Sequence, residues 1–373
     1  MFHAAHRHAD HEIETLAEFD QVIAAGTLSG LRIQSVNLRE RTFALLATDA
    51  SHAVFLGCPM EPDAAAKVRG DGALVFPPVP DLPFNPYRGL LYTATELFAG
   101  LGDGYEATLD HLTHRWFQET RTDRDVLASL LRSIHDDAVS DALDELLLES
   151  QVVGVMGGHA APRGSTAYEG AARLGRALAR AGLMVATGGG PGAMEAANLG
   201  AYLAPHGEEA LLESLELLAK HPSFTPSVTD WARAAFEVRE RWPAGGDSVG
   251  VPTWFYGHEP PNAFARHVAK YFSNATREDG LLSRCNAGVV FLPGAAGTVQ
   301  EMFDNTTPNY YESRGEPTPM VLVGREHWTT RLPAWPLLKS IARGRALESR
   351  IALVDSVDEV PGTLATLTGR RAG

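Results

Sequence analysis

The sequence has only two cysteines, Cys58 and Cys285, among its 373 residues. Two cysteines cannot form a disulfide framework or a paired Cys-x-x-Cys zinc site, so a reducing compartment is expected. The chain also lacks an apolar run close to the ~18 residues of a membrane span. Its first residues, MFHAAHRHADHEIE, lack the apolar core of a secretory signal. These absences predict a cytoplasmic protein rather than a secreted or membrane-spanning one.

Basic charge is scarce as well. Lysine and arginine together number 32 against 46 aspartates and glutamates, and the net charge is −14. A nucleic-acid groove or a site for an anionic membrane needs a basic surface, so neither partner is expected. A small anion is compatible with this balance, because backbone N–H groups and one arginine can hold a phosphate. The histidines near the start lie among acidic residues, and we expect no metal and no redox cofactor.

The length indicates two domains, and an apolar content of 45% is enough to give each a core. We expect an N-terminal domain over residues 1–122 and a catalytic domain over residues 123–373. The first contains strand-like runs at Thr42–Thr48 and Ala53–Gly57, then a proline-rich passage, Phe76–Tyr87, that excludes regular helix. It shows no glycine turn suited to phosphate. We therefore expect an α+β domain of unassigned role there.

From Gln151 onward, buried strands, glycine turns and amphipathic helices alternate. This alternation predicts βαβ units, a parallel sheet and helices on both of its faces, which is a doubly wound, Rossmann-like α/β fold. Helices are expected at residues 124–150, in an insert at about residues 205–246, and at Ala263–Thr276. The expected strands are Gln151–Met156, Leu183–Thr187, Val249–Phe255, Gly288–Leu292, Met320–Val323 and Ile351–Val354.

The stretch Leu292–Glu301 (LPGAAGTVQE) carries the strongest chemical signal. It places a glycine turn, a hydroxyl and a carboxylate where a buried strand becomes a helix. Such a turn directs unpaired N–H groups and the positive end of a helix dipole at one point, which suits a phosphate. Glu301 would lie one turn into the helix, where it could stabilise positive charge on a sugar. The alternative is a tight turn capped by Thr298, with Glu301 as ordinary first-turn charge.

A second glycine turn, Gly188–Gly192, also follows a predicted strand and opens a helix. Ligands of open α/β sheets bind along the carboxyl edge of the strands, so both turns are expected at one site. The spacing Gly188-x-Gly190-x-x-Ala193 also matches a dinucleotide fingerprint, but it follows the second strand of the domain rather than the first. NAD(P) is therefore the weaker interpretation.

Between the two turns lies the segment Trp254–Asn262 (WFYGHEPPN), followed by Arg277. Aromatic residues beside prolines and polar groups at a strand end can form a stacking wall for a nucleobase. They can equally form a hydrophobic anchor with a satisfied histidine. Arg277 precedes Glu301 by 24 positions, and the fold can bring the two together at the strand edge. A lone arginine at a helix end is otherwise a solvated charge.

These motifs resemble a known family. The stretch PGAAGTVQE (Pro293–Glu301) fits the PGGxGTxxE signature of the LONELY GUY (LOG) phosphoribohydrolases, which are often mislabelled lysine decarboxylases. With PTWFYGHEPPN, AKYFSNATREDGLL and FLPGAAGTVQEMFD, the sequence is most similar to the bacterial pyrimidine/purine nucleotide 5′-monophosphate nucleosidases of that superfamily. The resemblance covers Gln151 to the C-terminus and leaves residues 1–122 unmatched. The chain departs from the shorter members by carrying Ala295 in place of a glycine.

The resemblance implies a hydrolase that cleaves nucleoside 5′-monophosphates to nucleobase and ribose 5-phosphate, with Arg277 and Glu301 as the catalytic pair. It also implies a homo-oligomer, a dimer or a dimer-based assembly. Binding of the 5′-phosphate and ribose is implied for Gly188, Gly189, Gly190, Gly294, Gly297 and Thr298. Further substrate-binding residues are expected to be Gly157, Gly192, Tyr256, His258, Glu259, Asn262, Ala295 and Ala296.

Two other functions fit the same motifs. A nucleotide-binding or carrier protein would keep the glycine turns but would not need the carboxylate, because fold does not determine function. A cytokinin riboside 5′-monophosphate phosphoribohydrolase would differ only in its base. A lysine decarboxylase is disfavoured, because it would need a Schiff-base lysine and Lys270 is the only lysine near the motifs.

Overall fold

A computed structural model describes residues 12–122, 125–257, 259–313 and 315–369. The histidines that precede residue 12 and the predicted substrate residue His258 lie outside the described residues. The chain forms two compact units. The first comprises Met1–Leu91 and Thr120–Leu148, and the second comprises Tyr92–Glu119 and Glu149–Gly373. The predicted boundary near residue 122 stays a prediction, because compactness does not show which segment folds on its own.

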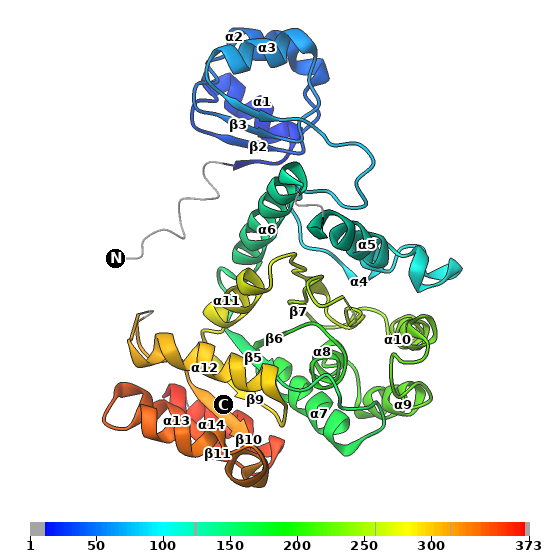
Figure 1. Cartoon of the computed structure of the whole chain (residues 1–373), viewed down its shortest axis with the longest axis vertical. Helices are drawn as coiled ribbons and strands as arrows, with labels where there is room; N and C mark the ends of the chain where they lie inside the picture. Colours follow the sequence, from blue (N-terminus) through cyan, green and yellow to red (C-terminus); the bar gives the residue numbers. More distant parts are fainter. Residues whose placement is uncertain (1–11, 123–124, 258, 314, 370–373) are drawn as a thin grey trace. The chain divides into compact units, whose positions relative to one another are not determined.

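The first unit contains a four-stranded sheet in the order β1-β2-β3-β4, and every pair is parallel. Its core is a cluster that includes Ile13, Ile33 and Phe55 from the strands and Phe19 and Val68 from the helices. The strands are β1 (Glu12–Ile13), β2 (Arg32–Gln34), β3 (Val54–Leu56) and β4 (Leu74–Phe76), and the helices are α1 (Leu16–Ala25), α2 (Thr42–Ala47), α3 (Pro62–Gly70) and α6 (Val126–Leu147) (Figure 1).

Two expectations for this unit need correction. The unit is α/β rather than α+β, because helices connect parallel strands in chain order. The run Thr42–Thr48 is not a strand, since residues 42–47 form helix α2. Only Leu45 of that helix is buried, and Phe43 is exposed. Its Ala-Leu-Leu-Ala sequence consists of strong helix formers, and no alternation of buried and exposed positions supports a strand.

The second unit is built on a seven-stranded parallel sheet in the order β11-β10-β9-β5-β6-β7-β8. The doubly wound α/β fold is therefore confirmed. The strands are β5 (Val152–Met156), β6 (Met184–Thr187), β7 (Ser248–Gly250), β8 (His267–Val268), β9 (Gly288–Phe291), β10 (Met320–Val323) and β11 (Ile351–Val354). The helices are α4 (Ala94–Leu97), α5 (Leu109–Thr122), α7 (Thr166–Arg180), α8 (Ala193–Tyr202), α9 (Glu208–Leu218), α10 (Val228–Arg241), α11 (Asn274–Arg284), α12 (Ala296–Tyr310), α13 (Ala334–Ala342) and α14 (Val360–Thr368) (Figure 1).

The core of this unit joins one face of the sheet to the helices that cover it. Val153, Val185 and Val290 of the strands pack in one cluster with α7, α8 and α14, and the insert helices α9 and α10 add residues such as Trp231 and Leu211. Strands β5, β7, β9 and β10 are buried along their whole length. Burial on both faces explains why these strands read as continuous apolar runs rather than alternating ones.

Two predicted elements of the second unit are wrong in extent. The strand expected at Val249–Phe255 ends at Gly250 in β7, since Pro252 lacks the N–H that would continue the sheet ladder. Residues 263–273 are not helical. They contain the short strand β8, and α11 begins only at Asn274, where the Ser273 hydroxyl caps it by accepting the Thr276 N–H. The cap supplies the start signal that apolar periodicity missed.

The strand order places a switch point between β5 and β9. The chain moves outward from β5 through β6, β7 and β8 and then returns to the other side of β5 as β9. Helices α11 and α12, on either side of β9 in sequence, lie in contact with each other (Figure 1). Ligands of doubly wound folds bind where the strand order reverses, at the carboxyl ends. The segments after β5, β6, β7 and β9 therefore define the candidate site.

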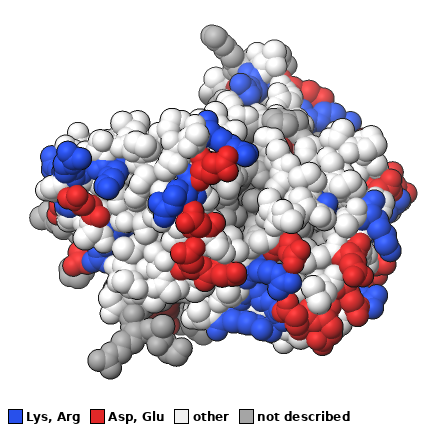
Figure 2. All heavy atoms as spheres, turned by 90° about the horizontal axis from the view of Figure 1, so that it is seen from below, with Lys and Arg blue, Asp and Glu red and all other residues white. Residues whose placement is uncertain are grey.

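None of the described helices is both long enough and apolar enough to cross a membrane. On the face drawn in Figure 2, Lys and Arg side chains alternate with Asp and Glu side chains, and no broad area of one sign is seen. The acidic net charge is thus distributed rather than gathered on this face.

An acidic cluster surrounds Arg32 within the first unit. Arg32 bonds to Glu12 and Asp141. Burial, partly offset by Arg32, raises the pKa of Glu12 to about 7. Burial together with the neighbouring charge of Glu145 also raises the pKa of Glu14 to about 7. These carboxyl groups therefore bind protons more tightly in the folded chain than in the unfolded chain.

This cluster predicts that the first unit loses stability as the pH rises from about 4.5 to about 7. Both folded pKa values are raised, so the stability contribution is present below the unfolded pKa and is lost as the pH rises through the folded pKa. The slope is at most about 1.4 kcal/mol per pH unit for each group. The double variant Glu12→Gln/Glu14→Gln should flatten the pH profile of the unfolding midpoint. Glu40→Gln, at an exposed position, should not. An unchanged profile in the double variant would exclude this cluster as the cause.

Candidate active site

Arg277 lies in the first turns of α11, and its side chain is only 10% exposed. Its Nε donates to the backbone carbonyl of Val251 at 2.7 Å, and its Nη1 donates to Oε1 of Glu301 at 3.3 Å. Val251 directly follows β7, and Glu301 lies on the helix that follows β9. A solvated helix-end charge would show neither burial nor two protein partners. Arg277 therefore joins the ends of two strands at the carboxyl edge.

Glu301 lies on α12, and its side chain is 13% exposed. Burial raises the pKa of this carboxyl group, the positive charge of Arg277 opposes the shift, and the negative charge of Glu278 adds to it. Glu278 itself bonds to Asn274 and Gln300 at 2.9 and 2.6 Å. A carboxylate with a raised pKa accepts a proton more readily than an ordinary surface glutamate. This property suits a general base.

The turn Gly188–Gly192 lies directly against Arg277. A Cβ at Gly188 would be 2.2 Å from Nη2 of Arg277, so any larger residue would displace the guanidinium group. At Gly189 the φ angle is +72°, and a Cβ there would be 2.6 Å from the ring of Pro252. Glycine is thus required here both by close approach and by conformation. The glycine turn and the Arg277 side chain therefore lie in direct contact.

A buried polar network holds this turn in place. Asn262, which is 1% exposed, accepts the N–H groups of Phe264 and Ala265, while its amide donates to the carbonyl of Gly190 at 3.2 Å. The backbone N–H of Asn262 also donates to the carbonyl of Gly189 at 2.8 Å. The hydroxyl of Thr187 accepts the Gly189 N–H at 3.0 Å. In this structure Asn262 fixes the shape of the turn.

The turn after β5 meets the turn after β9 at the switch point. A Cβ on Gly158 would lie 3.6 Å from Cα of Gly294, and a Cβ on Gly157 would lie 2.9 Å from that of Ala193. The side chains of Ala193 and Leu292 therefore leave no room for a Cβ at Gly157, whereas Gly158 is in ordinary contact with Gly294. The carbonyl of Gly294 is within 3.0 Å of Nε2 of His327. The segments that follow β5, β6 and β9 thus lie against one another at the carboxyl edge of the sheet.

Helix α12 starts at the carboxyl edge of the sheet, directly after the turn that follows β9, and no side chain caps it. Its N-cap is Ala295, and Ala296 is its first residue. Thr298 is buried against Gly294, and its hydroxyl does not cap the helix, whereas Gly297 faces open space. Uncapped N–H groups at a helix start are suited to an anion. Ala295 has a φ of −115°, which lies outside the left-handed region that favours glycine.

The aromatic segment after β7 divides between core and surface. Trp254 is 1% exposed and packs on Phe272 with ring centres 4.6 Å apart, so it cannot stack on a ligand. Tyr256 is 52% exposed, and its hydroxyl accepts from Asn274 at 3.2 Å. Of the described aromatic residues in this segment, Tyr256 and Phe255, which is 37% exposed, therefore remain available to contact a base.

Glu259 lies beside the glycine turn, where a Cβ on Gly190 would be 3.3 Å from its Oε2. Its other carboxylate oxygen is 3.0 Å from Nδ1 of His159. His159 directly follows the Gly157–Gly158 turn and was not predicted. The sequence HAAPRGS after that turn was the available signal, because it places a histidine and an arginine at a strand end.

A cavity of about 300 Å³ opens beside this turn, lined by residues that include His159, Pro191 and Phe224. Arg163 and Glu195, both buried, form an ion pair in its wall, with Nε to Oε2 at 3.0 Å. The loop between the insert helices supplies Phe224 to this lining. Arg163 and Glu195 were also missed by sequence reasoning, since 32 positions separate them.

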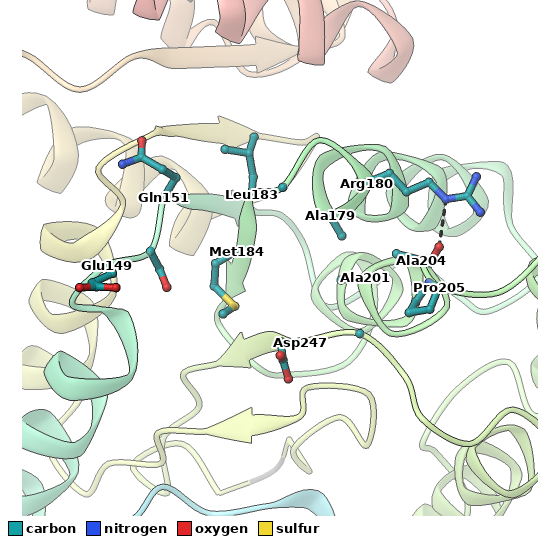
Figure 3. A pocket seen from close by; sticks show the side chains of 13 residues that line it. Glu149, Gln151, Ala179, Arg180, Leu183, Met184, Ala201, Ala204, Pro205 and Asp247 are labelled. Carbon is teal, nitrogen blue, oxygen red and sulfur yellow. Dashed lines mark hydrogen bonds between the residues drawn. The ribbon is translucent and has the colours of Figure 1, made fainter. Parts of the chain in front are cut away.

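A larger cavity of about 560 Å³ lies at the opposite edge of the same sheet. Its lining includes Gln151, Met184 and Asp247, which lie at the starts of β5, β6 and β7 (Figure 3). The guanidinium of Arg180 there donates to the carbonyl of Ala204 at 3.0 Å (Figure 3). The predicted catalytic residues are absent from its lining. They are absent from the lining of the smaller cavity as well, but that cavity borders the glycine turn at Pro191 and Gly192 and therefore lies at the carboxyl edge that carries the candidate site.

Among the described residues, no group of three or more His, Cys, Asp or Glu side chains is placed to hold a metal ion. Lys270 is buried, and its amino group bonds to Asp110 at 2.5 Å. A lysine held in this way is not presented to a cofactor aldehyde.

Gly192 provides a test of how closely the turns after β5 and β6 approach each other. It has φ +73° and ψ −131°, and a Cβ there would lie 2.5 Å from the carbonyl oxygen of His159. Gly182 has a similar φ of +76°, but a Cβ there meets nothing within 4 Å. Gly182→Ala should cost about 1–2 kcal/mol of unfolding free energy through backbone strain. Gly192→Ala should cost a further ~1–3 kcal/mol, through a φ and ψ pair that favours glycine and through the collision. Equal losses, measured by denaturant unfolding, would contradict the close approach of these turns.

Comparison with known proteins gives a partial family match. Residues 150–206 match the family model described as the SLOG cluster4 family. The matched region spans β5 to α8, so it includes the turns at Gly157–Gly158 and Gly188–Gly192 but neither Arg277 nor Glu301. No curated protein matches the chain.

Similar solved structures include the molybdenum cofactor binding protein from the phototrophic bacterium Rippkaea orientalis, at 15% identity and a TM-score of 0.37, covering 59% of this chain and 99% of that chain. The molybdenum cofactor carrier protein from Chlamydomonas reinhardtii is similar at 17% identity and a TM-score of 0.37, covering 60% of this chain and 100% of that chain. At such low identity and TM-score, the likeness carries no conclusion about the ligand or the role of this chain.

Proposed function

We propose that this protein hydrolyses the N-glycosidic bond of nucleoside 5′-monophosphates to free nucleobase and ribose 5-phosphate. The observation that carries the proposal is the buried pair of Arg277 and Glu301, 3.3 Å apart, held against the Gly188 turn at the carboxyl edge of the sheet. A module that only binds a phosphate needs the N–H groups of the turns. It does not need a carboxylate that repels the phosphate.

Each part of the proposed site has a separate role in the reaction. The uncapped start of α12 and the Gly188–Gly192 turn bind the 5′-phosphate. As the bond from C1′ to the base nitrogen breaks, the electron pair leaves with the base and positive charge develops on the sugar. Glu301 stabilises that charge and takes a proton from the attacking water, whose oxygen bonds to C1′. The departing base takes up a proton. Arg277 orients the phosphate or sugar and offsets leaving-group charge.

The substrate surface of this proposal also includes Tyr256 and Glu259, which lie beside the turns. No metal or redox cofactor has a step in the reaction. We further propose a homo-oligomer, a dimer or a dimer-based assembly, to be tested by light scattering.

The deciding experiment incubates the purified protein with AMP, GMP, CMP, UMP and a cytokinin riboside 5′-monophosphate. Free base and ribose 5-phosphate should appear in equal amounts. The matching nucleosides should be poor substrates, because the glycine turns are committed to the phosphate. Equal turnover of adenosine and AMP would contradict the phosphate assignment. Binding of a monophosphate in calorimetry without release of base over hours would identify a carrier instead.

A further inference from the structure

Asp110 lies far from the glycine motifs in sequence, yet it belongs to the second compact unit. It is 1% exposed on α5. Its Oδ1 accepts from Nε1 of Trp254 at 2.8 Å and from Nζ of Lys270 at 2.5 Å, while its Oδ2 accepts from the Tyr105 hydroxyl at 2.8 Å. One carboxylate therefore ties together three separate segments of this unit.

The tryptophan and lysine donors come from the segments that lead into the candidate site. Trp254 follows β7, and Lys270 follows β8. The segments also pair with each other, since the backbone N–H of Trp254 donates to the Tyr271 carbonyl at 2.9 Å and the backbone N–H of Tyr271 donates to the Pro252 carbonyl at 3.1 Å. Asp110 thus bonds to the side chains of two backbone segments that are already paired.

Arg277 depends on both of these segments. The carbonyl that accepts the N–H of its Nε belongs to Val251, three residues before Trp254. Ser273, which caps the helix that carries Arg277, lies three residues after Lys270. A displacement of either segment would move the acceptor or the helix relative to Glu301. Asp110 therefore holds each segment three residues from a group that supports Arg277.

The remainder of the segment Tyr92–Glu119 is also fastened to this unit. Tyr92 exchanges two backbone hydrogen bonds with Val268, at 3.0 and 2.8 Å. The N–H of Tyr105 donates to the hydroxyl of Thr229 at 2.9 Å. The helix that carries Asp110 is therefore connected at several points to the sheet and insert of the same unit.

We propose that Asp110 is a positioning residue for Arg277, acting through Lys270 and Trp254. The segment Tyr92–Glu119, which carries Asp110, would thereby help to hold the active site in its catalytic geometry. This inference rests on the proposed function. A buried ion pair is weak evidence for stability, because an apolar pair of similar volume is often as stable. The hydrogen bonds from Trp254 and Lys270 to Asp110 fix the orientation of the two chain segments that carry these residues, which an apolar contact would not do.

The test compares Asp110→Asn with the double variant Asp110→Leu/Lys270→Met. Asp110→Asn leaves the Lys270 charge without its counter-ion and should lower kcat/KM by about 10- to 100-fold. The double variant removes the unpaired charge and should recover thermal stability. Under the positioning role its turnover stays low, because the bond to Trp254 is also lost. If turnover returned with stability, Asp110 would be merely structural.

Asn309→Ala is the matched control. Asn309 is buried near the end of α12, and its side chain bonds to the backbone of Thr318 in both directions. Its loss should reduce stability with turnover near that of the wild type. A fall in turnover as large as that of Asp110→Asn would show that any destabilisation has this effect and would overturn the positioning role.

Hydrogen exchange separates this inference from the proposed function. In Asp110→Asn, amide exchange should accelerate at residues 253–256 and 273–278 while β5 and β6 remain as protected as in the wild type. Unchanged exchange in those segments would overturn the inference, whatever the activity. If the wild type releases no base, the proposed function fails, whereas faster exchange would still show that Asp110 positions the Arg277 segment.

Discussion

Glu301→Gln is expected to slow the release of free base by about 100-fold or more while monophosphate binding is largely retained. The substitution keeps the shape of the side chain and one oxygen that Arg277 can contact. It removes the negative charge that stabilises the sugar and the site that accepts the proton of water. Since both are needed in the transition state, the loss should appear in kcat rather than in KM.

Asp304→Asn is the matched control for this variant. It lies on the same helix one turn further on, is exposed, and undergoes the same change of carboxylate to amide. It should leave turnover within about twofold of the wild type, since surface charges contribute little. Initial rates at saturating AMP would measure both variants. A Glu301→Gln protein that turns over normally would assign the charge role to another group.

Arg277→Lys is expected to lose nearly as much activity as Arg277→Ala, by about 100-fold or more in kcat/KM. The guanidinium uses its Nε for Val251 and its Nη1 for Glu301, and its Nη2 lies against Gly188. These three directions need a planar fork. A lysine ammonium on a flexible stem cannot reproduce them together, although it keeps the charge.

Arg284→Lys tests whether any arginine substitution in α11 has this effect. Arg284 lies in the last turn of the same helix, where its Nη1 donates to the carbonyl of Gly280 at 2.8 Å. Its variant should keep near wild-type activity. Circular dichroism must show that the Arg277 variants remain folded. Folded Arg277→Lys and Arg277→Ala proteins with normal kcat/KM would exclude Arg277 from the site.

The elements that could be predicted from the sequence are those whose signals are local. Buried parallel strands appear as short apolar runs, and glycine turns mark where those strands end. The run Gln151–Met156 and the turns at Gly188–Gly192 and Gly294–Gly297 were therefore predictable, as was the doubly wound class of the fold. Glu301 was also identifiable as a candidate, because it lies four residues after the Gly294–Gly297 turn, where ligands of such sheets bind. Arg277 follows a predicted helix rather than a strand end, and its catalytic role was implied by the family resemblance.

How these parts meet depends on contacts between segments that lie far apart in the chain. Trp254 reads as a ligand-stacking residue in sequence, but its indole is buried and bonded to Asp110, which lies 144 positions earlier. Asp110, His159, Arg163 and Glu195 carry no motif of their own. Their surroundings arise from segments that are distant in the chain. Side-chain burial, ion pairing and pKa depend on such non-local neighbours, and a pattern within one stretch of sequence contains no information about them.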